Sequence, residues 1–349
     1  MSNIERCDEC LIPFSAPGIY KTSDNICNIC RDYQPCNVKG EDELYKEIKS
    51  ESGKLSDFDC IVPVSGGLDS FYTIYYLKKR MGLAVLGVNY DNGMVSSSGR
   101  RVVNLIESNL KIPIVYRRYS RDQIHRAVSD SIRSLLRFGP RYMQSALCRH
   151  CGYGIRASVY NEMIKQNLNS VWGTHNMDFI PFRYCKDIGL VKYIFQENWY
   201  YALRAILGRY IQIKNLSTIG NPIFKVIFKQ FGYPDMPKKY SHLKIISFFD
   251  YVPWNKKRMT SELKKDGFDT NFVKVPHSDC KLSPVVDHIL RNAWTVGKKE
   301  VYVCNQVRAG QIDKEEGMKL INSIRSEELD TTFLKEIGLN NCEIERLLI

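Results

Sequence analysis

The sequence predicts an α/β protein built on a doubly wound parallel sheet. Four short apolar runs have the character of buried strands, and they occupy residues 59–64, 83–90, 112–116 and 169–173. Stretches expected to be helices lie between them or beside them, at residues 70–80, 98–110 and 153–166. Strands that alternate with helices at this spacing form parallel sheets. A glycine turn directly after the first run supports the same fold, because such turns lead from a strand into a helix.

Composition places the chain among soluble globular proteins. It has 349 residues, 44% of them hydrophobic and 25% charged, which excludes a disordered or fibrous chain. No apolar run is long enough to cross a membrane, and no secretory signal is visible, so we expect a cytoplasmic protein. Its 12 cysteines are then expected to bind metal or take part in catalysis, since thiols stay reduced in that compartment. The net charge of +12 favours an anionic partner.

The sharpest local signal is the turn Ser65-Gly66-Gly67-Leu68-Asp69-Ser70. It follows the first predicted strand and opens the first predicted helix. Backbone N–H groups at a helix N-terminus bind anions, and glycine lets a phosphate approach the backbone closely. The two serine hydroxyls add further donors. The turn therefore predicts a phosphate-binding site.

This turn resembles the PP-loop of the ATP pyrophosphatases, and it lacks the lysine pattern of a Walker A loop. The resemblance implies an adenine nucleotide alpha hydrolase-like fold and an enzyme that transfers AMP from ATP to a substrate oxygen. It assigns the pyrophosphate of ATP to residues 65–70, with Asp69 and Ser70 catalytic. A nucleophile then displaces AMP.

Two further stretches are similar to nucleotide-contacting parts of PP-loop enzymes. Asp91 follows the second strand, and Gly173, His175 and Asp178 follow the fourth. Ligands bind at the carboxyl ends of parallel strands in open α/β sheets. The resemblance implies that Asp91, Gly173 and His175 bind ATP, and that Mg²⁺ lies near Asp69 or near a catalytic Asp178.

The N-terminal segment predicts a metal module. Cys7 and Cys10 form one C-x-x-C pair, and Cys27 and Cys30 form a second pair after a gap of 16 residues. Two such knuckles supply four thiolates, which suit one structural Zn²⁺ and leave no open position for a substrate. We therefore expect a zinc-ribbon-like module over residues 1–40.

The same segment resembles the start of the N-acetyl sugar amidotransferases, a PP-loop branch of surface-polysaccharide synthesis. The stretch Y-V-P-W-N at 251–255 matches that family as well. The resemblance implies that ATP adenylates the acetamido oxygen of a nucleotide sugar, and that ammonia displaces AMP to give an acetamidino sugar for lipopolysaccharide, capsule or flagellin glycan. A separate glutaminase with an ammonia-channel subunit is then the expected partner.

A second cysteine set points to a different nucleophile. Cys148 and Cys151 form a third C-x-x-C pair, and Cys280 follows far downstream. This set resembles the tRNA thiolation enzymes of the PP-loop superfamily, in which three thiolates hold a [4Fe-4S] cluster. His150, Cys185 or His277 could instead complete a second zinc site. Thiolates suit both metals, so zinc and iron–sulfur stay open, as does sulfur transfer to tRNA.

The remaining expectations concern organisation. The PP-loop domain is expected at 41–185, a basic aromatic helical insertion at 186–250, and a completing helical region at 251–349. The insertion interleaves aromatic and basic residues, and a lid, a nucleic-acid surface or a peripheral membrane contact are the open readings beside an ordinary helical subdomain.

Overall fold

A computed structural model describes residues 4–16, 18–22, 24–35, 37–50, 56–118, 121–138, 146–174, 240–271 and 278–349. Its centre is a five-stranded sheet with the strand order β3-β2-β1-β4-β5, in which every pair of neighbours is parallel. The strands are β1 Cys60–Pro63, β2 Val85–Asp91, β3 Ile114–Arg118, β4 Ser170–Trp172 and β5 Ile245–Ser247. The predicted parallel α/β sheet is confirmed, and the four predicted strands lie within two residues of their expected starts.

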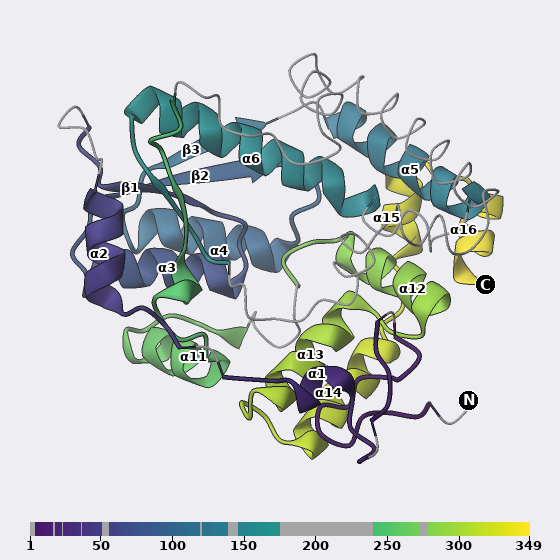
Figure 1. Ribbon diagram of the computed structural model, residues 1–349. Coiled ribbons are helices and arrows are strands. Elements are labelled where there is room, and N and C mark those ends of the chain that lie inside the picture. The colour runs from purple at the N-terminus through teal and green to yellow at the C-terminus, as the bar shows by residue number, and fades with distance from the viewer. Residues whose placement is uncertain are drawn as a thin grey trace.

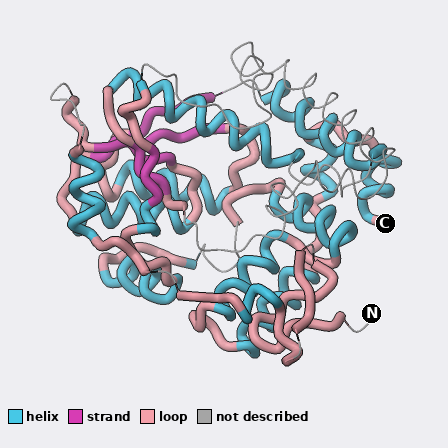
Figure 2. The backbone as a smooth tube through the Cα atoms, in the orientation of Figure 1, coloured by secondary structure: helices cyan, strands magenta, loops and turns pink. Residues whose placement is uncertain are grey.

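Helices cover both faces of the sheet (Figures 1 and 2). On one face α3 (Leu68–Tyr75), which continues as the π-helical turn η1 (Tyr76–Arg80), and α4 (Ser97–Ser108) pack against side chains such as Val62. On the other face α6 (Ala146–Gln166) packs against Ile61. Because successive side chains of a strand point to opposite faces, adjacent residues of β1 enter two separate cores.

The fifth strand lies inside the range that was expected to be a helical insertion. Residues 240–250 contain β5 and the 3-10 turn η5 (Phe248–Asp250), and β5 pairs with β4 from Ser170↔Ile245 to Trp172↔Ser247. The helical expectation is therefore wrong for 240–250. β5 is short and follows a long aromatic and basic stretch, so its sequence gave little strand signal. Residues 186–239 of the insertion, and residues 175–185 before it, lie outside the described residues.

The C-terminal part is helical, as predicted. Its helices are α11 Lys256–Lys265, α12 Ser283–Trp294, α13 Lys298–Arg308, α14 Lys314–Arg325, α15 Thr331–Glu336 and α16 Asn341–Leu348. The long helix α5 (Arg121–Phe138) shares a core with α12, α15 and α16. Among the described helices, none is long and apolar enough to cross a bilayer.

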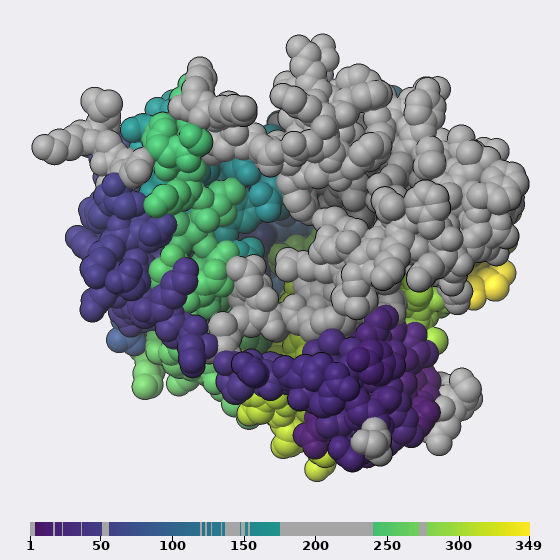
Figure 3. Space-filling view, viewed as in Figure 1, coloured from purple at the N-terminus to yellow at the C-terminus, as the bar shows by residue number. Residues whose placement is uncertain are grey.

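The N-terminal module packs on the C-terminal helices rather than on the sheet (Figure 3). It contains the single turn α1 (Asn28–Arg31), and α2 (Glu41–Lys49) follows as the predicted connecting helix. Leu11 and Ile12 of the module share a core with Val303 of α13 and Ile321 of α14. The N-terminal module and the helices α13 and α14 therefore form one packed unit.

Candidate active site at the carboxyl ends of the strands

The predicted phosphate turn joins β1 to α3. Gly67 is the N-cap residue of α3, and no side chain caps this helix end. The two serines close the turn: Ser70 Oγ lies 3.2 Å from Ser65 Oγ and donates to Gly67 O at 3.1 Å, and Gly67 N donates to Ser65 Oγ at 3.1 Å. The helix end thus keeps N–H groups available for an anion, with two hydroxyls beside them.

Gly66 shows why the turn needs glycine. Its φ is +92°, a region that other residues enter at a cost, and a Cβ there would lie 2.5 Å from the carbonyl oxygen of Gly99 in α4. Both the conformation and the close approach of α4 exclude a side chain. The turn also lies at the place where β2 and β4 flank β1, which is the switch point of the sheet and the usual ligand site of such folds.

Asp69 and Gly173 are placed close together. The carboxylate oxygen Oδ1 of Asp69 accepts a hydrogen bond of 2.8 Å from Nε1 of Trp254. A Cβ on Gly173 would lie 2.7 Å from the carbonyl oxygen of Asp69, so the end of β4 touches the start of α3. The predicted residues His175 and Asp178 lie outside the described residues, and their roles stay predictions.

Asp91 ends β2 but faces its own loop. Its Oδ1 accepts from Gly93 N at 3.1 Å, and its Oδ2 lies 3.4 Å from Nε of Arg118 on β3. It is absent from the residues that line the cavity beside the phosphate turn. Its predicted contact with ATP therefore stays a prediction.

A cavity of about 170 Å³ opens beside the phosphate turn. Most of its wall is apolar, from Val64 on the turn to Leu147 and Ile155 on α6. Its polar and sulfur-bearing residues are Ser65, Tyr90, Asn92, Met94, Cys151, Asp279, Cys280, Ser283 and Lys298. An apolar pocket with a few convergent polar groups is the usual form of a small-molecule site.

Cys151 and Cys280, 129 residues apart in sequence, line this one cavity. Asn92 Nδ2 donates to Cys151 Sγ at 2.9 Å. The backbone places Cys280: it forms a bridge with Val95, while Ser96 N donates to Asp279 O and Lys281 N donates to Met94 O, both at 2.8 Å. The structure thus brings together two members of the second cysteine set.

The other candidates for this set are not placed. Cys148 belongs to α6, one turn before Cys151, but its side chain lies outside the described part of the structure, as does that of His150. Cys185 and His277 lie outside it entirely. Zinc and iron–sulfur therefore both stay open at this site.

Gly154 explains how α6 comes close to the site. A Cβ on Gly154 would lie 2.1 Å from the ring of Tyr90 at the end of β2, so the helix and the ring touch directly. Sequence reasoning missed this contact, although a glycine inside a helix is a signal for close packing.

Sequence reasoning also missed three side chains at the turn. Trp254 belongs to the Y-V-P-W-N stretch and reaches Asp69. Asp279 lies over the turn: its Oδ2 is 3.3 Å from where a Cβ on Gly67 would be. Burial raises the pKa of Asp279, and the charge of Lys298 and the Ser65 hydroxyl oppose that rise. The position of Asp279 next to Cys280 could have indicated that it lies at the site, whereas no sequence feature indicated Lys298.

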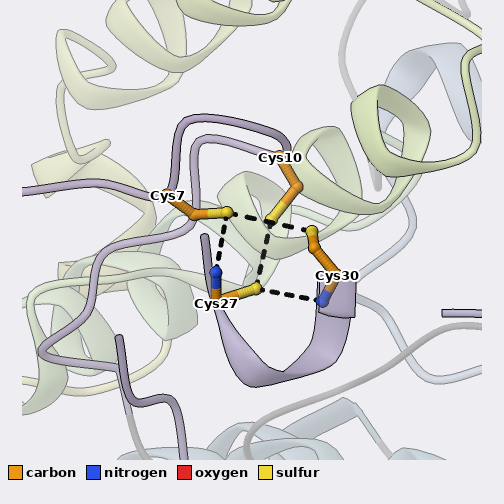
Figure 4. Close-up of side chains that lie close together, drawn as sticks. All are labelled: Cys7, Cys10, Cys27 and Cys30. Carbon is orange, nitrogen blue, oxygen red and sulfur yellow. Dashed lines mark hydrogen bonds between the residues drawn. The ribbon is translucent and has the colours of Figure 1, made fainter. Parts of the chain in front are cut away.

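The N-terminal cysteines form a second, separate centre (Figure 4). The sulfurs of Cys7, Cys10, Cys27 and Cys30 all lie within 4.8 Å of one another. Cys7 Sγ and Cys30 Sγ are 3.8 Å apart, as are Cys10 Sγ and Cys27 Sγ. Four thiolates around one ion with metal–sulfur bonds of about 2.3 Å are about 3.8 Å apart in a tetrahedron. The donor set therefore fits one Zn²⁺, or one iron, and is too tight for a four-iron cluster whose thiolates bind separate irons.

The surroundings of this centre suit thiolates. Cys27 N donates to Cys7 Sγ at 3.1 Å and Cys30 N donates to Cys27 Sγ at 3.3 Å. Hydrogen bonds within the cluster lower the pKa of Cys7 and of Cys27, whereas such bonds together with burial raise the pKa of Cys10 and of Cys30. Arg308, at the end of α13, donates to Cys10 Sγ at 3.2 Å and to Cys30 Sγ at 3.4 Å. Its charge offsets part of the negative charge of four thiolates.

Comparisons with known proteins find only a distant likeness. No family model matches the sequence, and no curated protein matches it. Among solved structures, the chain is similar to the U34-tRNA thiolase NcsA from Methanococcus maripaludis with its [4Fe-4S] cluster. The identity is 13% and the TM-score 0.34, over 98% of this chain and 96% of that chain. A likeness at this level assigns no activity to this chain.

Proposed function

We propose that this chain is an ATP-dependent enzyme that transfers AMP onto an oxygen of its substrate. The observation that carries the proposal is the turn 65–70: an uncapped helix end with two serine hydroxyls at the switch point of a parallel sheet. Such an end binds phosphate through N–H groups and the helix dipole. The resemblance of the turn to a PP-loop selects the pyrophosphate of ATP as that ligand.

In the first step, the substrate oxygen attacks the α-phosphorus of ATP. The bond from that phosphorus to the bridging oxygen breaks, and pyrophosphate leaves with its charge held at the turn. Ser65 and Ser70 donate to phosphate oxygens, and Trp254 fixes the carboxylate of Asp69. Mg²⁺ near Asp69 or Asp178, when bound, supplies positive charge to the phosphates. Asp91, Gly173 and His175 are proposed to contact the nucleotide.

For the second step the cavity favours sulfur transfer. Cys151 and Cys280 line the cavity beside Ser65, so a sulfur-bearing site lies next to the activated oxygen. Thiolates suit iron and zinc, and Cys148, one turn earlier in α6, is the third candidate donor for a three-cysteine site. Such a site, if it holds a [4Fe-4S] cluster, supplies a place for inorganic sulfide. Sulfur then displaces AMP from an acceptor such as a tRNA base.

Nitrogen transfer is the second candidate, and Trp254 favours it. The Y-V-P-W-N stretch carries the resemblance to N-acetyl sugar amidotransferases, and its tryptophan contacts the phosphate turn. Under this candidate an N-acetyl nucleotide sugar is adenylated on its acetamido oxygen. Ammonia from a separate glutaminase then displaces AMP and gives an acetamidino sugar for surface polysaccharide such as lipopolysaccharide.

One comparison separates the two candidates. Anaerobically purified protein is incubated with ATP and Mg²⁺, and pyrophosphate release is measured with bulk tRNA or with UDP-N-acetyl sugars and ammonium. Stimulation by tRNA together with bound iron supports sulfur transfer. Stimulation by a sugar, in protein that contains zinc only, supports amidination and rules out the sulfur route. If neither tRNA nor the sugar with ammonium stimulates pyrophosphate release, both candidates are contradicted.

A further inference from the structure

Three charged residues open helix α13, and two of them are fixed in buried ion pairs. Lys299 Nζ pairs with Glu327, and Glu300 pairs with Arg6 and Arg325 at 2.8 and 2.9 Å. Lys299 and Glu300 are almost fully buried. Neither is therefore available to a ligand. Lys298 is the third charged residue, and it lines the cavity beside the phosphate turn.

Lys298 faces the cavity beside the phosphate turn. Among the described residues that line this cavity it is the only cation, and Asp279 is the only carboxylate. The positive charge of Lys298 lowers the pKa of Asp279 against the effect of burial, and the Asp279 carboxylate lies over Gly67. Ser65 of the turn and Lys298 thus line the same cavity, and Lys298 is half-buried there.

The helix that carries Lys298 is anchored at both ends. At its start, Asp287 Oδ1 accepts from Lys299 N at 2.8 Å, and a Cβ on Gly297 would lie 2.2 Å from Asp287 Oδ2. At its end, Arg308 donates to two sulfurs of the four-cysteine centre. The Asp287 carboxyl group lies against this helix end and accepts one of its N–H groups, so an anion has little room at the backbone there. The side chain of Lys298 is what α13 presents to the cavity.

The phosphate turn itself has no cation. Its donors are backbone N–H groups and two hydroxyls, and Leu68 stands at its centre. ATP carries several negative charges, and more charge develops on pyrophosphate as it leaves. Enzymes that transfer phosphoryl or nucleotidyl groups usually meet this charge with lysine, arginine or Mg²⁺.

We propose that Lys298 is the cation of the ATP site and binds the phosphate groups opposite the turn 65–70, with Asp279 as the positioning residue that holds it before ATP binds. This inference rests on the proposed function. A charge-assisted hydrogen bond contributes on the order of 10- to 100-fold in binding. Lysine suits the task as a compact charge on a flexible stem.

The test measures binding of inorganic pyrophosphate and of ATP by calorimetry, beside pyrophosphate release. Lys298→Met should weaken pyrophosphate binding and raise KM for ATP by about 10- to 100-fold, and Lys298→Arg should keep part of the affinity. Lys335→Met removes the same charge from an exposed position on helix α15, and it should change neither pyrophosphate binding nor KM for ATP. Unchanged binding in Lys298→Met, while the wild type releases pyrophosphate, overturns the inference and leaves the function standing.

A second measurement needs no variant. Reductive methylation of the wild-type protein, read by mass spectrometry, should slow several-fold at Lys298 when pyrophosphate is present and stay unchanged at Lys335. Equal rates at Lys298 with and without saturating pyrophosphate overturn the role of Lys298. A wild-type protein that neither binds pyrophosphate nor releases it from ATP overturns the proposed function as well.

Discussion

The hydrogen bond from Trp254 to Asp69 allows a quantitative test of the site. Trp254→Phe keeps an aromatic ring in the core beside α3 and removes the Nε1–H group that donates to Asp69 Oδ1 at 2.8 Å. A hydrogen bond to a charged group contributes about 1.5–3 kcal/mol. If Asp69 needs this bond to hold its catalytic position, kcat/KM for pyrophosphate release should fall by about 10- to 150-fold.

Trp172→Phe is the matched control. Trp172 ends β4, and its buried Nε1 has no hydrogen-bond partner among the described residues. The same substitution there should leave pyrophosphate release within about twofold, because no hydrogen bond among the described residues is lost. Thermal unfolding of both variants shows whether the fold is kept. A folded Trp254→Phe protein with full activity would refute the positioning role of Trp254.

Three other predictions concern the metal module, the turn and pH. Cys10→Ser should release bound metal and lower Tm by about 5 °C or more, since a structural tetrathiolate site contributes to folding, whereas Cys342→Ser on exposed α16 should change neither metal content nor Tm. Gly66→Ala should abolish pyrophosphate binding. It should also lower the free energy of unfolding by more than Gly82→Ala, for which backbone strain alone predicts a loss of ~1–3 kcal/mol, because only at Gly66 would the added Cβ also clash with a carbonyl oxygen. Burial lowers the pKa of His288, so as pH falls this histidine is protonated in the unfolded chain before it is protonated in the folded protein. The free energy of unfolding should therefore decrease below about pH 6.5. The accompanying drop in Tm should be smaller in His288→Gln. An equal drop in the variant would contradict this assignment.

The sheet and the phosphate turn could be predicted because their signals are local. The apolar runs of β1 and β2 are short and buried, and the turn Ser65–Ser70 follows a strand directly. The four N-terminal cysteines were predictable for the same reason, since their spacing alone specifies a centre of four thiolates. β5 was missed because its short apolar stretch directly follows a long aromatic and basic segment and was included in it.

The rest of the site depends on contacts between distant parts of the chain. Asp279 reaches the turn only because its segment pairs with residues 94–96, and Lys298 reaches the cavity only because α13 is fixed by Asp287 and by the cysteine module. Trp254 lies 185 residues from Asp69. No local period or motif encodes such contacts, so tertiary packing alone reveals them.

Pyrophosphate release from ATP is the measurement that tests the central claim most directly. With tRNA and a source of sulfide, or with an N-acetyl nucleotide sugar and ammonium, the wild type should convert ATP to AMP and pyrophosphate in equal amounts. Asp69→Asn and Ser65→Ala should each reduce this conversion by at least about tenfold while both proteins stay folded. Release of phosphate and ADP instead, or unchanged AMP formation in both variants, would contradict the account.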